Sequence, residues 1–158
     1  MDTQPLTHDT FVLERTYPRP LERVFGAFAE AAQKRRWFAA SDHHDLESFE
    51  QDFRVGGFER IRYRFRPGTP FEGVVLESEG LHLDIVANRR IVIASSMAMG
   101  GRRFSASLVS VELVSDPAGT RLTCTHQGAY FEGSDGPARR AEGWEKLFAR
   151  LSAELSSS

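Results

Sequence analysis

The sequence has little cysteine and little net charge, and each shortage excludes some classes of function. Among 158 residues Cys124 is the only cysteine, which excludes an internal disulfide framework and a zinc site built from several cysteines. The charges of the 20 basic and 22 acidic residues nearly cancel, so we expect no surface that binds nucleic acid or an anionic membrane. No hydrophobic run approaches the ~20 residues of a membrane span, and residues 1–10 lack a signal-peptide pattern. We therefore expect a cytoplasmic protein without nucleic-acid partners or membrane insertion.

Motifs of the common catalytic and nucleotide-binding classes are also missing. The sequence has no Gly-x-Ser-x-Gly nucleophile elbow, no Gly-x-x-x-x-Gly-Lys phosphate loop and no Gly-x-Gly-x-x-Gly fingerprint. Cys124 lies among apolar residues of a predicted strand, where a thiol usually acts as a small inert hydrophobic group. We expect no cofactor and no metal, and the pattern favours a binding protein over an enzyme.

Phenylalanine is abundant, with 12 Phe against 3 Tyr and 2 Trp. Such rings need a dry environment and carry no polar group that requires a partner. Most of the surplus is predicted to belong to the core, because seven rings fall into phase with the inner faces of predicted strands and helices: Phe11, Phe25, Phe28, Phe49, Phe53, Phe65 and Phe148.

The order of predicted elements indicates an α+β fold in a single domain, residues 1–158, with an ordered core from about 11 to 155. Residues 11–17 alternate as a strand that ends at Pro18, and helices are predicted from Pro20 and over 31–38. The charged run 33–36 is interpreted as a solvated face. Short alternating runs then predict antiparallel strands. These cover 46–53, 58–65, 71–77 and 81–86 (one strand, or a pair broken at Gly80), 91–99, 104–114 and 120–131.

A last, long helix is predicted from Pro137 to residue 155, with apolar residues at spacings of three and four. Gly143 lies inside it, where glycine costs ~1 kcal/mol relative to alanine. We interpret Gly143 as a point of close packing against a strand, with close approach to a ligand as the alternative. Because one long helix cannot fill the concave side of a curved sheet, a cavity is expected between them.

Five short motifs follow one another along the chain, at residues 52–58, 84–92, 119–123, 127–128 and 142–144. Their order and spacing resemble the START-like superfamily called SRPBCC, over residues 11–155. They are most similar to its branch of activator homologues of the heat-shock chaperone ATPase, also labelled polyketide-cyclase-like. The resemblance implies a helix-grip (START/Bet v-like) fold. In that fold a seven-stranded antiparallel sheet wraps around the C-terminal helix, two short helices follow strand 1, and a deep apolar ligand cavity is present.

Two residues depart from the pattern of these relatives, which tend to have Pro and Glu where this chain has Ala87 and His126. His126 shares one side of the last strand with Leu122 and Cys124, so it is predicted to point toward the cavity. It would bind a ligand there or act as an acid–base group with a pKa near neutrality. The alternative is a buried histidine bonded to a neighbour.

The expected ligand-binding residues are Trp37, Phe38, Tyr63, Met97, Met99, His126, Tyr130, Trp144 and Phe148, with core packing as the alternative. His43 and His44, beside Asp42 and Asp45, are interpreted as a solvated loop, because adjacent residues of an extended chain point to opposite sides. His82 and Asp84 are expected at the surface or in a local hydrogen bond.

Three functions remain open at this level. The first is binding of a small apolar or aromatic molecule in the internal cavity. The second is a chaperone-partner module that stimulates a heat-shock chaperone ATPase, and the third is a cyclase- or hydrolase-like enzyme with His126 as general base. The expected partner is the small ligand, while a homodimer and a chaperone partner are left open.

Overall fold

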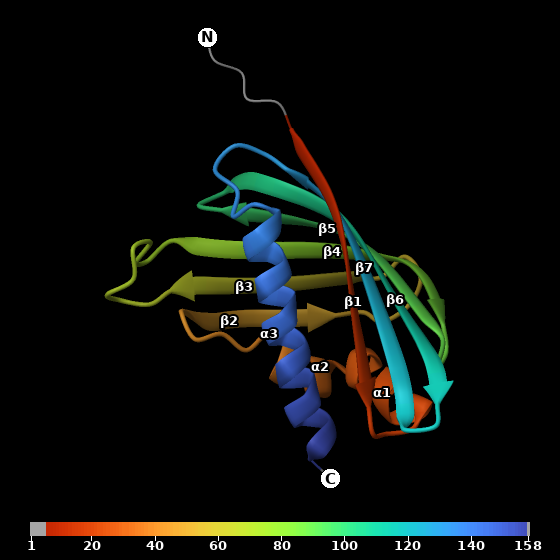
Figure 1. The fold of residues 1–158 in the computed structure, drawn as a ribbon. Helices are drawn as coiled ribbons and strands as arrows, with labels where there is room; N and C mark the ends of the chain where they lie inside the picture. Colours follow the sequence, from red (N-terminus) through yellow and green to blue (C-terminus); the bar gives the residue numbers. More distant parts are fainter. Residues whose placement is uncertain (1–5, 158) are drawn as a thin grey trace.

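A computed structural model describes residues 6–157 (Figure 1). Within this range the chain forms β1 (Thr7–Tyr17), α1 (Leu21–Ala29), α2 (Ala31–Phe38), β2 (His44–Gln51), β3 (Phe58–Phe65), β4 (Val75–Val86), β5 (Arg90–Met99), β6 (Arg102–Asp116), β7 (Gly119–Tyr130) and α3 (Pro137–Ser156). The strands form one antiparallel sheet in the order β1-β7-β6-β5-β4-β3-β2. The predicted α+β helix-grip fold is confirmed.

The curved sheet wraps around α3, and α1 and α2 lie at the C-terminal end of this helix (Figure 1). Two helices begin at a proline: Pro20 precedes α1, and Pro137 is the first residue of α3. The first N–H groups of a helix have no acceptor within it, so the N–H that proline lacks costs no hydrogen bond at this position. None of the helices in residues 6–157 is long and apolar enough to cross a membrane.

The main core lies where α1, α2 and the second half of α3 meet β5, β6 and β7. Its fully buried members include Val24, Trp37, Leu122, Phe148 and Leu151. The Trp37 indole Nε1 donates to the Ala27 carbonyl at 2.8 Å, so this ring joins α2 to α1. A second, smaller cluster joins Ala39, at the end of α2, to residues of β3 and β4: Ile61, Tyr63 and Leu76. None of the seven phenylalanines assigned to the interior is exposed.

Strand positions agree with the alternation in the sequence except at the start of β1, which begins at Thr7 instead of residue 11, and around residues 66–80. Residues 71–77 were expected to be strand, but residues 66–74 form turns and β4 begins only at Val75. Gly80 does not break this strand. It lies opposite Ser95 of β5, and the Ile93 side chain of the same strand occupies the space that a Cβ at residue 80 would need. Gly80 is therefore a position of close strand packing.

Two tyrosines allow a matched test of how β1 is held to α3. The Tyr17 hydroxyl donates to the Phe148 carbonyl at 3.1 Å, whereas the buried Tyr130 hydroxyl has no partner among the described residues. We expect Tyr17→Phe to lower the free energy of unfolding by about 1 kcal/mol, and Tyr130→Phe to be neutral or stabilising. Urea denaturation measures both, and equal losses would contradict the assignment.

Candidate functional site

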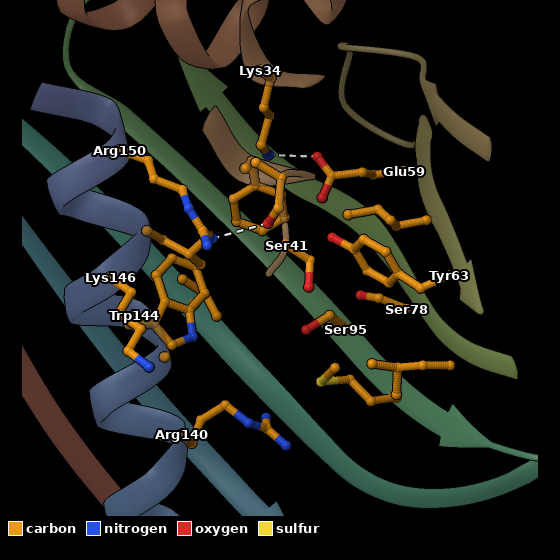
Figure 2. Close-up of a pocket in the computed structure, with 18 of the residues that line it drawn as sticks. Lys34, Ser41, Glu59, Tyr63, Ser78, Ser95, Arg140, Trp144, Lys146 and Arg150 are labelled. Atoms are coloured by element: carbon orange, nitrogen blue, oxygen red, sulfur yellow. Dashed lines mark hydrogen bonds and ion pairs between the residues drawn. The ribbon is translucent and has the colours of Figure 1, made fainter. Parts of the chain in front are cut away.

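A cavity of about 560 Å³ lies between the concave face of the sheet and α3 (Figure 2). This volume falls in the range of roughly 300–1,000 Å³ that small-molecule sites occupy. Most of the surface of its wall is apolar, and this part comes from Phe28, Phe38, Ala40, Ile61, Phe65, Leu76, Ile91, Ile93, Met97, Val109, Val111, Trp144 and Leu147.

The period of two along each strand explains why these residues meet. Successive strand side chains point to opposite faces, so every second residue of β3, β4, β5 and β6 faces α3. On β5 this set is Ile91, Ile93, Ser95 and Met97, all of which line the cavity. The wall is thus determined by the same alternation that predicts the strands.

Besides Ser41 in the segment before β2, three residues of the sheet place hydroxyl groups in the cavity wall: Tyr63, Ser78 and Ser95. The strand register places them on adjacent strands, with Ser78 opposite both Ile61 and Met97. Figure 2 shows all three side chains directed into the cavity. Burial raises the pKa of Tyr63 to about 12, so its hydroxyl stays protonated and able to donate at neutral pH. The set is suited to a carbonyl or hydroxyl oxygen of a ligand.

A buried ion pair between Lys34 and Glu59 borders the cavity. The ammonium group also lies 4.4 Å from the centroid of the Phe38 ring, a cation–π contact. Lys34 was expected on a solvated face with its neighbours, and this was wrong for Lys34, which is only 6% exposed. The helix turns Arg35 and Arg36 outward and Lys34 inward, where Glu59 of β3 compensates its charge.

His126 is buried and lines the cavity, with its ring stacked on Phe11 at 4.6 Å between centroids. Burial, followed by the positive charge of Arg140, lowers the pKa of His126 to about 4. The imidazole is therefore neutral at physiological pH. Its Nδ1 atom has no hydrogen-bond partner among the described residues.

The exposed lining residues mark the mouth of the cavity, between α3 and the segment before β2. They are Ala40, Asp42 and His43 before β2, Asp135 just before α3, and Arg139, Gly143 and Lys146 of α3. The interpretation of Gly143 as a close packing point was wrong, because a Cβ at this position would meet nothing within 4 Å. Gly143 faces the opening, where the missing side chain leaves room.

The histidine pair before β2 is only partly a solvated loop. His43 is exposed, but His44 begins β2 and is half-buried, so the loop interpretation was wrong for it. Its ring lies 4.9 Å from Tyr63 and its Nδ1 hydrogen bonds with the Ser41 hydroxyl. Burial lowers the pKa of His44.

The other histidine considered from the sequence, His82, is fully buried. Its Nδ1 lies 2.9 Å from the Gly57 carbonyl. Asp84, two residues later, instead pairs with Arg90 at 2.7 Å. Both are local structural contacts. Within residues 6–157 no group of three or more His, Cys, Asp or Glu side chains is placed to hold a metal ion.

The structure brings together five of the nine expected ligand-binding residues in the cavity wall: Phe38, Tyr63, Met97, His126 and Trp144. The other four do not line it. Trp37 and Phe148 are core residues, Met99 packs at the end of β5, and the Tyr130 ring lies 5.3 Å from the Arg140 guanidinium.

Sequence reasoning missed most of the polar lining: Lys34, Ser41, His44, Glu59, Ser78, Ser95, Arg139, Arg140, Lys146 and Arg150. Strand alternation could have found three of them, since Glu59 precedes Ile61, Ser78 follows Leu76 and Ser95 precedes Met97 at the same parity. Most of the others lie on helices and loops, and their place depends on how these approach the sheet.

Comparison with known proteins agrees with this architecture. The family described as Activator of Hsp90 ATPase homolog 1-like protein matches residues 18–156. The chain belongs to this family. Its resemblance to START-like proteins is thereby confirmed, and with it the superfamily inferred from the five motifs.

Solved structures of similar proteins extend the match over almost the whole chain. The Mll3558 protein from Rhizobium loti is 44% identical, covering 96% of this chain and 99% of its own, with a TM-score of 0.84. A putative uncharacterized protein from Rhizobium leguminosarum is 32% identical, covering 98% of each chain, with a TM-score of 0.90. An AHSA1-like protein from Aeromonas hydrophila is 22% identical, covering 94% and 93%, with a TM-score of 0.68. A comparison with curated proteins finds no match.

The depressed pKa of His126 predicts a pH-dependent stability. The unfolded chain binds a proton here near pH 6.5, whereas the folded chain binds it only near pH 4. Stability is therefore fully present above about pH 6.5 and falls between there and pH 4, by about 1–3 kcal/mol. Replacing the ring by a non-titrating one in His126→Phe should flatten this slope.

Urea midpoints at several pH values measure the effect, and His43→Gln, at an exposed position, is the matched control that should keep the wild-type slope. A slope that His126→Phe leaves unchanged would show that other groups cause the acid sensitivity.

Proposed function

We propose that this protein binds a small apolar or aromatic molecule in the cavity between α3 and the sheet. The observation that carries the proposal is the cavity itself, about 560 Å³ of space with a mostly apolar wall and few hydroxyl groups. Interiors without a ligand role are normally packed to high density, with few voids larger than a water molecule. The START-like family supports a ligand-binding fold.

The energetics of such binding are adequate for a metabolite. A ligand that buries about 300 Å² of apolar surface gains about 7 kcal/mol before the costs of immobilisation. Hydrogen bonds to Tyr63, Ser78 or Ser95 add little net affinity but orient the ligand, because an unpaired polar atom in this wall would be penalised. A ligand with an apolar body and one oxygen-bearing group fits best.

Binding can be tested with a substitution that places a large side chain in the cavity. We expect Ser95→Trp to weaken binding of the neutral probe N-phenyl-1-naphthylamine by about tenfold or more, because the indole would occupy the space of the probe. Fluorescence titration measures the dissociation constant. Ser96→Trp is the matched control, since residue 96 points to the opposite face of β5 and does not line the cavity.

Thermal unfolding of both variants checks that they are folded. Wild-type protein that does not bind the probe, or a folded Ser95→Trp variant that binds it as tightly as Ser96→Trp, would refute binding in this cavity.

The family description gives a second candidate, stimulation of an Hsp90 ATPase. This role requires a docking surface on the outside of the molecule and does not need the cavity. Adding the purified chain to Hsp90 and measuring phosphate release distinguishes the two: stimulation that Ser95→Trp leaves intact would support the co-chaperone role.

A further inference from the structure

The charges of α3 are segregated with respect to the cavity. All four of its basic residues line the cavity: Arg139, Arg140, Lys146 and Arg150. None of its three acidic residues does: Glu142, Glu145 and Glu154. Basic groups thus follow one side of the helix at spacings of three and four around Gly143. This side is the one that borders the mouth.

Two of these cations are already neutralised by the protein. Arg140 is buried and pairs with Asp135 at 2.8 Å, and it also donates to the Ser105 hydroxyl. Arg150 donates to the Ala40 carbonyl at 2.9 Å and lies 3.4 Å from Asp42. The fifth lining cation, Lys34, pairs with Glu59 as described above. These pairs account for all three carboxylates of the cavity wall.

Arg139 and Lys146 remain. Both line the cavity, but among residues 6–157 no carboxylate oxygen lies within 4.0 Å of a side-chain nitrogen of either residue. These two residues leave two uncompensated positive charges at the mouth of the cavity, whereas the whole chain has a net charge of −2. Cations without a carboxylate partner at the rim of an apolar cavity attract anions.

Geometry allows both groups to reach one point. Seven residues of helix separate them by about 10 Å along the axis, and residues at these spacings share a face. Gly143 lies between them and has no side chain to fill the space above the helix. Figure 2 shows Lys146 next to Trp144 on the helix that borders the cavity. An anionic group above Gly143 would have a cation on either side and the apolar cavity beneath it.

We propose that the ligand of this cavity is an amphiphile with a single acidic head group, bound at the mouth by Arg139 and Lys146. The proposal rests on the proposed function, since it specifies the ligand of the same cavity. The apolar body lies against Trp144, Met97 and the aliphatic wall, and the head group remains partly solvated. A carboxylate and a phosphate share the required chemistry.

A matched pair of fluorescent probes tests the proposal separately from cavity binding. 1-Anilinonaphthalene-8-sulfonate carries an anionic group, whereas N-phenyl-1-naphthylamine has the same aromatic framework without charge. We expect Lys146→Gln and Arg139→Gln each to weaken binding of the sulfonate about five- to tenfold, because each removes a charge-assisted contact. Binding of the neutral probe should change less than about twofold.

Arg121→Gln is the matched control, because Arg121 is an exposed cation of β7 that does not line the cavity. If the neutral probe binds but the sulfonate responds equally to Lys146→Gln and Arg121→Gln, the acidic ligand is refuted while cavity binding stands. If neither probe binds to the wild type, the proposed function fails and this inference fails with it.

Competition then identifies the head group. Decanoate and decyl phosphate are compared with decanol for displacement of the neutral probe, at equal concentrations and constant ionic strength. The proposal is supported if either acid displaces the probe about tenfold more effectively than decanol does, and if Lys146→Gln reduces this advantage. The acid that competes more effectively then indicates the head group. Decanol that competes as well as both acids would overturn it.

Discussion

One helix is too narrow to fill the concave side of a seven-stranded sheet, and the site depends on this mismatch. A helix with its side chains is about 10–12 Å wide. Seven strands at a spacing of about 4.8 Å extend over about 29 Å, and the sheet curves around α3. The helices α1 and α2 fill one end of the concave side, and the remaining volume is the cavity.

The two halves of α3 consequently have different roles. Its C-terminal half carries Phe148, Leu151 and Leu155, all buried in the core against α1, α2 and the sheet. Its N-terminal half carries Trp144, Gly143 and most of the basic groups that border the cavity. The core packing of the C-terminal half thus positions the N-terminal half of α3 along the mouth of the cavity.

The sequence predicted the fold well, because strand alternation and helical spacing are local patterns. Helix α2 and strand β3 have the predicted bounds, and the superfamily followed from motifs spread over the chain. The site was predicted less well. Trp37 and Phe148 belong to the same aromatic class as Phe38 and Trp144, and only tertiary packing decides which rings face the core and which face the cavity.

The charged lining could not be predicted for a related reason. Lys34 lies in a run that looks solvated, and its burial depends on Glu59, which is 25 residues away in sequence. Gly143 suggested close packing, yet it faces an opening that exists only once α3 and the segment before β2 are placed. Long-range arrangement, which periodicity does not contain, determines both.

The central claim is that the space between α3 and the sheet is a binding site for a small molecule. A crystal structure of the protein grown with N-phenyl-1-naphthylamine tests it most directly. The account predicts electron density for the probe between Trp144 and β5, within hydrogen-bonding reach of Tyr63, Ser78 or Ser95. A structure in which side chains fill this space and the probe lies only on the outer surface would contradict it.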